Sequence, residues 1–272
     1  MNFYVLIGNP LGHSLSPRIH ALISEVTGVP CEYALMPLET GEVEPFLWSL
    51  AEGGIAGVNV TIPHKVLAAQ SVDALSPEAR SLGAINTIRP TPRGTMGHNT
   101  DLHGFQAMLD AARIAPEGQR CVVLGAGGSA RAVTAALRQR HAAEIFVVSR
   151  QPEAVSTPFP GAEVISYDDL RGMDGGLLVN CTPVGMSPRG EGCPVDAPVV
   201  ARFGAVADLI YNPRETVLLH MAAERGLPRA NGLLMLVSQA VRAREIWEDA
   251  RYGAAVERAV HDRLAAEWEA TP

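Results

Sequence analysis

The sequence predicts an α/β protein with two domains, and three observations support this fold class. Short apolar runs that end in polar turns alternate with helical patterns, which is typical of open sheets covered by helices. A glycine-rich turn at residues 125–130 follows one such run and precedes an apolar helix, as in dinucleotide-binding units. The length of 272 residues is sufficient for two hydrophobic cores.

Composition argues against several classes of protein. Hydrophobic residues make up 47% of the chain, which indicates a globular rather than a disordered protein. The net charge is −7 and no run of lysine or arginine occurs, which argues against nucleic acid or a membrane surface as a partner. The start of the chain predicts a strand rather than a signal peptide, and no segment has the character of a membrane span. We therefore expect a cytoplasmic protein.

The cysteines and histidines predict no metal centre. The four cysteines are scattered and form no CxxC pair, and the eight histidines include no HExxH motif. Reduced thiols are therefore favoured over disulfides or a zinc site.

Two serines lie at the start of the first predicted helix. A strand at Phe3–Gly8 leads into a loop rich in glycine and proline, and a helix follows from about Pro17 to a stop at Gly28. Ser16 fits the N-cap of this helix. Alternatively, the hydroxyls of Ser14 and Ser16 hold a carboxylate beside the helix N-terminus.

The main polar cluster follows a buried strand within residues 57–65. Asn59 and Thr61 place an amide and a hydroxyl at the exit of this strand, and Pro63 ends it. Lys65 then falls in the first turn of a helix, where a cation is unfavourable for the helix dipole. Open α/β sheets bind ligands at such strand exits, so Lys65 is a candidate for catalysis.

Periodicity and turn residues predict the remaining elements. Strands are predicted at Tyr33–Leu38, Gly83–Arg89 and Gly94–Gly97 (as a hairpin), Arg120–Leu124, Glu144–Val148, Leu177–Asn180, Ala205–Ile210 and Gly226–Asn231. Helices are predicted at about Gly41–Ala51, from Lys65 to before Ser76, around Leu102–Leu109, at Ala132–Leu137, around Val217–Met221, at Leu233–Ala240 and in the tail to Pro272.

A second polar cluster contains Asn86 in the hairpin and the run Asn99-Thr100-Asp101 after it. Asn99 or Thr100 fits the cap of the next helix. Asp101 is placed in the first turn of that helix, where the helix dipole stabilises a carboxylate. On these local grounds, the role of a helix-start carboxylate is favoured over catalysis for Asp101.

The turn at 125–130 has the G-x-G-x-x-A form of the dinucleotide fingerprint, between a strand and a helix as the mechanism requires. Its glycines allow a pyrophosphate to approach backbone N–H groups at the helix N-terminus. The next strand ends at Ser149-Arg150, without the acidic residue typical of NAD sites. Arg150 is suited to a 2′-phosphate, which favours NADP as the cofactor, unless this arginine only points to solvent.

Gln239 lies in the almost continuously apolar helix that Gly232 opens. A helix of this composition is expected to be buried, so Gln239 needs a hydrogen-bond partner, and a ligand would serve.

Taken together, these motifs resemble the shikimate dehydrogenase family, and the match runs nearly from end to end of the chain. The motifs are Ser14-Leu15-Ser16, Asn59 to Lys65, Asn99-Thr100-Asp101, the glycine loop Gly125 to Ala130, Asp208 to Pro213 and Gly232 to Gln239. Such an ordered set is far more specific than the glycine loop alone.

The resemblance implies an NADP-dependent enzyme that reduces 3-dehydroshikimate to shikimate, with Lys65 and Asp101 as the catalytic pair. It also implies that Ser14 and Ser16 hold the substrate carboxylate. The other implied substrate-binding residues are Asn59, Thr61, Asn86, Tyr211 and Gln239. The implied cofactor-binding residues are Gly125, Ala126, Gly127, Gly128, Ser129, Ala130, Ser149, Arg150, Thr182, Gly232 and Met235.

Two departures from the family pattern leave alternatives open. NADP-type members often carry a second basic residue shortly after the arginine, whereas Gln151 to Ala154 hold none, so use of NAD stays open. Both hydroxyls of the loop are serines, whereas quinate-using relatives tend to have a threonine, so shikimate is favoured over quinate. The rivals are a quinate/shikimate dehydrogenase using NAD, a non-catalytic NADP-binding regulator, and a two-domain dehydrogenase acting on a folate-type substrate.

The expected organisation is a substrate-binding domain at residues 1–100, with 233–272 packing back on it, and a Rossmann-like NADP-binding domain at 101–232. The protein is expected to be a monomer or a homodimer.

Overall fold

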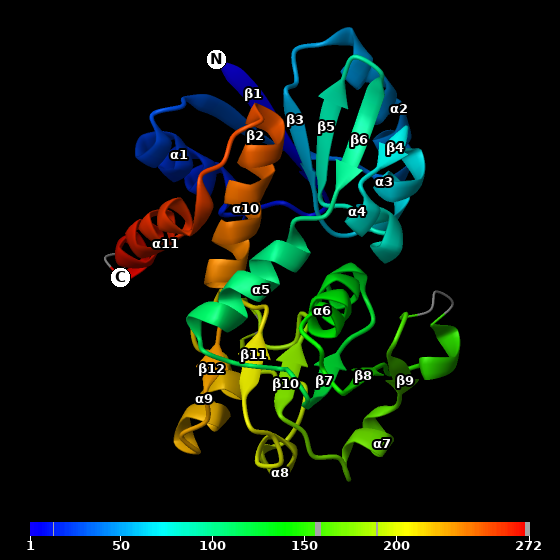
Figure 1. The fold of residues 1–272 in the computed structure, drawn as a ribbon, viewed down its shortest axis with the longest axis vertical. Helices are drawn as coiled ribbons and strands as arrows, with labels where there is room; N and C mark the ends of the chain where they lie inside the picture. The colour runs from blue at the N-terminus through cyan, green and yellow to red at the C-terminus, as the bar shows by residue number, and fades with distance from the viewer. Residues whose placement is uncertain (13, 156–158, 189, 270–272) are drawn as a thin grey trace. The chain divides into compact units, whose positions relative to one another are not determined.

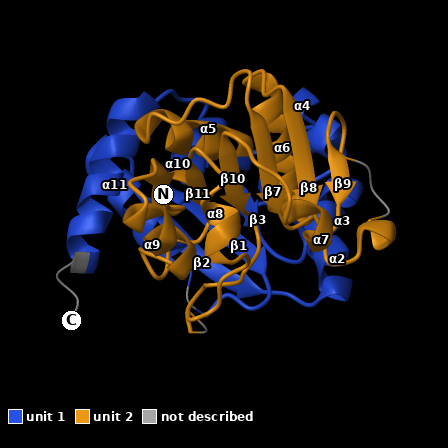
Figure 2. Cartoon of the chain, turned by 90° about the horizontal axis from the view of Figure 1, so that it is seen from below, with its two compact units in different colours: residues 1–101, 236–272 blue, residues 102–235 orange. Residues whose placement is uncertain are grey.

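The computed structural model describes residues 1–12, 14–155, 159–188 and 190–269. The chain folds into two compact units, residues 1–101 with 236–272 and residues 102–235, which are coloured separately in Figure 2. Each unit contains a six-stranded sheet with helices around it. The α/β class and the return of the C-terminal helices to the first unit, both predicted from the sequence, are confirmed. His13 of the predicted loop and the last residues of the predicted tail lie outside the described residues.

The first unit begins with strands that alternate with short helices (Figure 1). Its strands are β1 (Asn2–Gly8), β2 (Cys31–Pro37), β3 (Gly57–Val60), β4 (Ala74–Leu75), β5 (Thr87–Thr91) and β6 (Gly94–His98). Its helices are α1 (Ser16–Thr27), α2 (Val43–Ser49), α3 (Lys65–Ser71), α4 (Pro77–Leu82), most of α10 (Leu233–Glu248) and α11 (Gly253–Glu269), with 3₁₀ turns at Thr40–Glu42 and Leu50–Glu52.

The sheet of this unit has the strand order β2-β1-β3-β5-β6-β4, and only β5 runs antiparallel to its neighbours. Strand β1 is buried on both faces because its side chains alternate between two cores. Val5 and Ile7 pack with residues of α2 and α3 such as Val43. Tyr4 packs on the other face, with Trp247 of α10.

Helix α1 forms where the sequence predicts it. Pro17 lies in its first turn, its apolar side chains at Ile19, Leu22 and Ile23 are buried, and it ends at Gly28 in the left-handed conformation. Figure 1 shows α1 beside α11, and Arg18 Nε of α1 donates to Glu267 Oε2 of α11 at 2.8 Å. The C-terminal helix is therefore part of the first unit's own packing.

The second unit has a wholly parallel sheet in the order β12-β11-β10-β7-β8-β9, the arrangement of a Rossmann fold. Its strands are β7 (Arg120–Leu124), β8 (Glu144–Val148), β9 (Glu163–Ile165), β10 (Leu177–Asn180), β11 (Val206–Asp208) and β12 (Arg229–Ala230). Its helices are α5 (Asp101–Ala111, from Leu102 onward), α6 (Gly128–Gln139), α7 (Tyr167–Leu170), α8 (Ala197–Val200) and α9 (Val217–Glu224), with a 3₁₀ turn at Pro152–Ala154. Strand order reverses between β7 and β10, which is where such sheets bind ligands.

Three short helices were not predicted, although each carries a sequence signal at its start. Ser76 Oγ accepts from the Ala79 N–H at the start of α4, Ser166 forms a capping box with Asp169 at α7, and Asp196 caps α8. These helices span four to six residues, too short to show helical periodicity.

Other boundaries also differ from the prediction. The first hairpin strand begins at Thr87 rather than Gly83, and it includes Pro90, which pairs with Thr95. Helix α10 continues to Glu248, eight residues beyond the predicted end at Ala240.

Gly57 provides a test of packing in the first unit. A Cβ atom on Gly57 would lie 2.4 Å from the Trp247 ring, whose Nε1 donates to the Ile88 carbonyl at 2.9 Å. We expect Gly57→Ala to lower the free energy of unfolding by about 1–3 kcal/mol, the usual cost of overpacking. Gly41→Ala is the control, because a Cβ there meets nothing within 4 Å. Urea unfolding of both variants measures this, and equal stability would contradict the packing argument.

Candidate active site

The topology of the first sheet gathers the predicted site residues at one edge. Strands β1, β3 and β6 are parallel and end at this edge, and antiparallel β5 begins there. The serine loop follows β1, Lys65 follows β3, Asn86 precedes β5, and Asp101 follows β6. Four segments that are distant in sequence therefore meet because of strand direction alone.

Backbone hydrogen bonds tie the loops after β1 and β3 together. The Thr61 N–H donates to the Ile7 carbonyl at 2.9 Å, and the Asn9 N–H donates to the Ile62 carbonyl at 3.0 Å. A Cβ on Gly8 would lie 2.4 Å from Thr61 Cγ2, so the close approach requires glycine. The serine loop and the Asn59–Lys65 segment are held as one structure.

Lys65 and Asp101 form an ion pair. Lys65 is the first residue of α3, and its Nζ lies 2.5 Å from Asp101 Oδ2. The Lys65 side chain is 11% exposed and that of Asp101 is 2% exposed, so the pair is largely withdrawn from water. Asp101 begins α5 as predicted, but its carboxylate does more than stabilise that helix, because it is bonded to Lys65.

Asn86 is the centre of the surrounding network and is 3% exposed. Its two Nδ2 hydrogens are shared among Asp101 Oδ1, Thr100 Oγ1 and Gln239 Oε1, each at 2.9 Å. Its Oδ1 accepts from the Thr100 N–H at 2.8 Å and from the Thr87 hydroxyl at 3.1 Å. Asn86 thus connects the carboxylate of the ion pair with Gln239 of α10. The partner expected for Gln239 is, in this structure, the amide of Asn86.

The two serines are placed differently from the N-cap prediction. Leu15 is the N-cap of α1, Ser16 is its first helical residue, and no side chain caps the helix, so the predicted N-cap role of Ser16 is wrong. Instead Ser14 Oγ accepts from the Ser16 N–H at 3.3 Å. Pro17 is thereby the second helical residue, within the first turn, where proline is tolerated.

In the second unit, the glycine loop lies at the reversal of strand order. Gly125 follows β7 with φ +96°, and Gly127 is the N-cap of α6, where an added Cβ would meet nothing within 4 Å. The first turn of α6 has no acidic residue. An open loop before the positive end of a twelve-residue helix fits a pyrophosphate.

The other predicted cofactor residues lie on neighbouring elements of this unit. Ser149 and Arg150 follow β8, which pairs with β7, and Arg150 is exposed. Thr182 follows β10, and its Cγ2 would be 3.0 Å from a Cβ on Gly125. The Thr182 hydroxyl donates to Asn180 Oδ1 at 2.7 Å, which fixes the threonine beside the glycine loop.

Gly232 and Tyr211 belong to one tightly packed region of the second unit. The Gly232 N–H donates to the Ile210 carbonyl at 3.0 Å, and a Cβ on Gly232 would lie 2.0 Å from the Leu209 carbonyl oxygen. The glycine therefore allows two backbones to touch. Met235, three residues later on α10, is buried. Burial raises the pKa of Tyr211.

Comparison with known proteins identifies the family to which this chain belongs. Residues 6–88 match the family model described as the shikimate dehydrogenase substrate binding domain. A shikimate dehydrogenase (NADP(+)) of Clostridium perfringens is 37% identical over 267 residues, covering 97% of this chain and 98% of the relative. The chain belongs to the shikimate dehydrogenase family. The family resemblance stated from the sequence is thereby confirmed.

Solved structures agree with this membership. A chorismate mutase/shikimate 5-dehydrogenase fusion protein from Clostridium acetobutylicum has a TM-score of 0.94 and 41% identity, over 98% of both chains. Shikimate 5-dehydrogenase from Thermus thermophilus in complex with NADP(H) and shikimate has a TM-score of 0.85 and 33% identity, over 96% of this chain and 99% of that chain.

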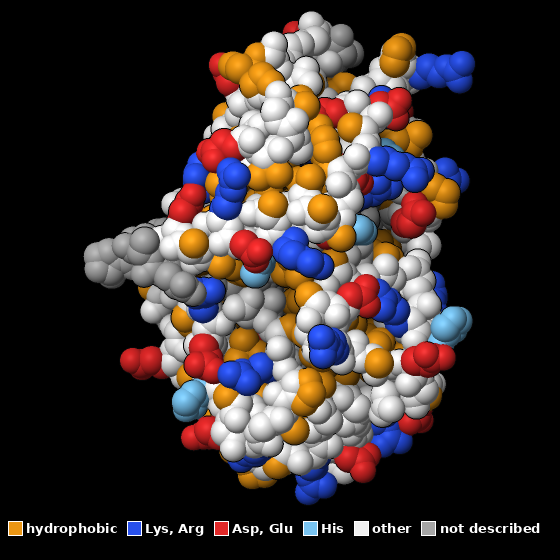
Figure 3. All heavy atoms as spheres, turned by 60° about the vertical axis from the view of Figure 1, so that its left-hand side comes forward, with side chains coloured by type: hydrophobic (Ala, Val, Ile, Leu, Met, Phe, Trp, Pro, Cys, Tyr) orange, Lys and Arg blue, Asp and Glu red, His pale blue; other side chains and the backbone are white. Residues whose placement is uncertain are grey.

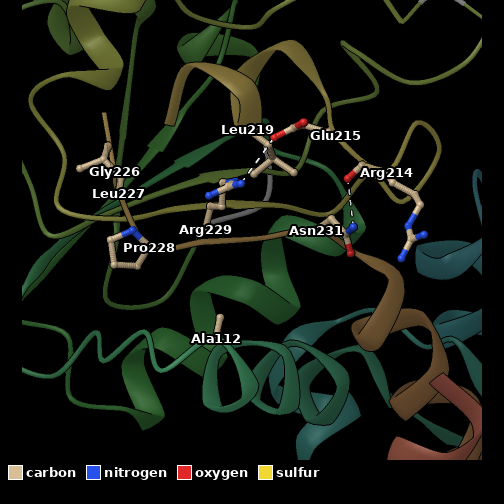
Figure 4. A pocket seen from close by; sticks show the side chains of 9 residues that line it. All are labelled: Ala112, Arg214, Glu215, Leu219, Gly226, Leu227, Pro228, Arg229 and Asn231. Atoms are coloured by element: carbon tan, nitrogen blue, oxygen red, sulfur yellow. Dashed lines mark hydrogen bonds and ion pairs between the residues drawn. The ribbon is translucent and has the colours of Figure 1, made fainter. Parts of the chain in front are cut away.

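This member of the family also has a pocket away from the predicted residues. The pocket has a volume of about 670 Å³ in the second unit and includes the ion pair between Arg229 and Glu215 (Figure 4). Asn231 lines it and donates to the Arg214 carbonyl at 3.0 Å. None of its lining residues belongs to the glycine loop, so it is not the expected cofactor site.

Two broader features of this family member concern metals and surfaces. Among the described residues, no group of three or more His, Cys, Asp or Glu side chains is arranged to hold a metal ion. None of the described helices combines the length and apolar character that a membrane span requires. Figure 3 shows acidic and basic side chains interspersed on one face rather than separated by sign.

Sequence reasoning missed the network roles of Thr87, which follows Asn86, and of Thr100, which lies in the run Asn99-Thr100-Asp101. Thr87 is 0% exposed and Thr100 is 1% exposed, and both bond to Asn86. The Asn-Thr pair repeated at 86–87 and 99–100 was the available signal, because paired strands place such repeats side by side.

Asp208 generates a pH-dependent prediction. It is 0% exposed and accepts from Thr216 Oγ1 at 2.7 Å, Asn180 Nδ2 at 3.0 Å and the Ile210 N–H at 3.1 Å. Burial is the main cause that raises its pKa from 3.8 to about 6, against these three hydrogen bonds. The folded chain therefore binds more protons than the unfolded chain between pH 4 and 6, so stability falls as pH rises through this window.

We expect the free energy of unfolding of Asp208→Asn, relative to that of the natural chain, to increase by about 3 kcal/mol as pH rises from 4 to 7. Urea unfolding across this range measures the difference. Asp168→Asn is the control, because that side chain is 85% exposed. Stability curves of the natural chain and Asp208→Asn that run parallel with pH would contradict the assignment.

Proposed function

We propose that this chain is an NADP-dependent shikimate dehydrogenase. The reaction is 3-dehydroshikimate + NADPH + H⁺ ⇌ shikimate + NADP⁺. Membership of the family and the agreement of the relatives' names support both the oxidoreductase activity and the cofactor. We further propose that the first unit binds the substrate and the second binds NADP, in a cytoplasmic protein that is a monomer or a homodimer.

The observation that carries the catalytic assignment is Lys65 itself. The chain has 22 lysines and arginines in total, and Lys65 is the only lysine among them. An arginine stays protonated in proteins, whereas a lysine can release and regain a proton. This single lysine amine is held 2.5 Å from Asp101, at the edge of the sheet where substrate is expected.

The substrate side follows from the types of group at this edge. The hydroxyls of Ser14 and Ser16, at the start of α1, suit a carboxylate. Asn86 and Gln239, with Thr61, offer amides and a hydroxyl that suit the ring hydroxyls of shikimate. Tyr211 of the second unit is a further proposed substrate-binding residue. Such groups reject an analogue that lacks a hydroxyl, because it leaves them unpaired.

When bound, NADPH supplies the hydride that adds to the ketone carbon. As that bond forms, the electron pair of the C=O bond moves to oxygen, and the Lys65 ammonium donates the proton that completes the alcohol. Asp101 holds this ammonium in place and balances its charge. In the oxidation direction, the neutral Lys65 amine accepts the hydroxyl proton. Gly125, Gly127 and the start of α6 hold the pyrophosphate, and Arg150 meets the 2′-phosphate.

The first test uses shikimate oxidation followed at the absorbance of the reduced nicotinamide. We expect turnover with NADP⁺, and we expect Lys65→Ala to lower kcat by roughly 10²- to 10⁴-fold, the range for loss of a general acid–base. Shikimate affinity measured by calorimetry should change far less. Lys65→Arg keeps the charge and should be nearly as impaired, because it cannot release a proton.

An unimpaired Lys65→Arg variant would contradict proton transfer by this residue and leave it an electrostatic role. No turnover with any substrate and cofactor pair, in a folded protein that binds NADPH, would favour a non-catalytic regulator.

The second test concerns Arg150. We expect Arg150→Ala to raise the KM for NADP⁺ by about 10-fold or more, since a charge-assisted bond to phosphate is lost, and to leave the KM for NAD⁺ nearly unchanged. Arg171→Ala, another exposed arginine of the second unit, is the control. Equal effects on both cofactors would contradict a 2′-phosphate contact. Higher kcat/KM for NAD⁺ or quinate in the natural chain would favour the quinate/shikimate alternative.

A further inference from the structure

Tyr33 of β2 lies beside the catalytic network without contacting Lys65 or Asp101. Its ring stacks on His20 of α1, with ring centroids 4.0 Å apart and an angle of 12° between the planes. Its hydroxyl donates to Asn59 Oδ1 at 2.8 Å. His20 is fully buried, and burial followed by the charge of Arg244 lowers its pKa well below the usual range, against the effect of Asn59. Tyr33 therefore rests on a neutral ring.

Burial raises the pKa of the Tyr33 hydroxyl, and this effect is larger than the opposite effect of the Ser16 hydroxyl. The Tyr33 hydroxyl therefore keeps its proton. As a donor it fixes Asn59 with Oδ1 toward β2. The Asn59 Nδ2 then faces β5, where it donates to the Asn86 carbonyl at 3.0 Å and to Thr87 Oγ1 at 3.1 Å. A reversed amide would place Asn59 Oδ1 against the Asn86 carbonyl, an acceptor against an acceptor, and would remove the acceptor of the Tyr33 hydroxyl proton.

This direction continues to the ion pair. Because Thr87 Oγ1 accepts from Asn59, its own proton is directed to Asn86 Oδ1 at 3.1 Å. Asn86 Oδ1 is thereby held toward Thr87 and the Thr100 N–H, and its Nδ2 is held toward Asp101 Oδ1 at 2.9 Å. The hydrogen bonds along this route run in one direction, from the Tyr33 hydroxyl through Asn59 and Thr87 to Asn86.

We propose that Tyr33 is a positioning residue. Its hydroxyl orients Asn86 through Asn59 and Thr87, and Asn86 in turn orients the Asp101 carboxylate that holds Lys65. Asn59 has both Nδ2 hydrogens engaged within the protein, so it serves the site through Asn86 rather than as a donor to a substrate hydroxyl. The kinetic part of this inference rests on the proposed function, whereas its structural part does not.

The test is Tyr33→Phe, which removes the hydroxyl and keeps the stacked ring. We expect kcat for shikimate oxidation to fall roughly 2- to 10-fold, the range of one neutral hydrogen bond, with the KM for NADP⁺ unchanged. Tyr4→Phe is the matched control. Tyr4 lies in the same aromatic group, with centroids 6.5 Å from His20, but its hydroxyl donates to Glu248 Oε1 at 3.1 Å. We expect Tyr4→Phe to stay within 2-fold of the natural chain.

A double-mutant cycle tests the route. Thr87→Val removes the hydroxyl that connects Asn59 to Asn86, so Tyr33→Phe should have little further effect in that background. Full additivity of the two substitutions would overturn the proposed route through Thr87.

Nuclear magnetic resonance separates this inference from the proposed function. Since Lys65 is the only lysine, ¹³C labelling of lysine Cε gives one resonance from the whole chain. We expect that resonance to shift in Tyr33→Phe and to stay in place in Tyr4→Phe, whether or not the protein turns over shikimate. No shift in Tyr33→Phe, in protein that melts as the natural chain does, would overturn the positioning role. Absence of turnover in the natural chain would instead contradict the proposed function.

Discussion

The site depends on one interaction, the ion pair between Lys65 and Asp101. Two charges this withdrawn from water lose hydration, and their attraction compensates only when further hydrogen bonds satisfy them. Here the second carboxylate oxygen accepts from Asn86, and Asn86 is in turn held by Thr87 and Thr100. This polar network is therefore what allows a buried ammonium and carboxylate to stay together.

This requirement explains why so much of the first unit is built around one sheet edge. Strand direction brings four distant segments together at this edge, and Gly8 allows the close approach to Thr61. The second unit repeats the principle at the end of β11. Asp208 is buried among three donors there, and Gly232 lets the chain pass against the Leu209 carbonyl. In both units, buried polar groups hold the loops that follow strands in place.

Much of this organisation was predictable from the sequence. Strands β8 and β10 were predicted with their exact bounds because buried parallel strands are continuous apolar runs. The short helices α4, α7 and α8 were not predicted, since periodicity needs more turns than they have. The local reading of Asp101 as a helix-start carboxylate shows a different limit. Its position in α5 was right, but the contact with Lys65 depends on the pairing of β3 with β5, which no local pattern contains.

The composition of the chain carries a further argument about the ion pair. Everywhere else the basic residues are arginines, several of them in fixed roles, such as Arg244, which is fully buried and bonds to Glu248 and the Val29 carbonyl. A guanidinium suits such permanent contacts, because it holds its charge and directs several donors at once. In the proposed mechanism those properties would be a disadvantage at position 65, since reduction of the carbonyl and oxidation of the alcohol need a proton that moves. If arginine serves permanent contacts and lysine serves proton transfer, lysine is expected only at this one position.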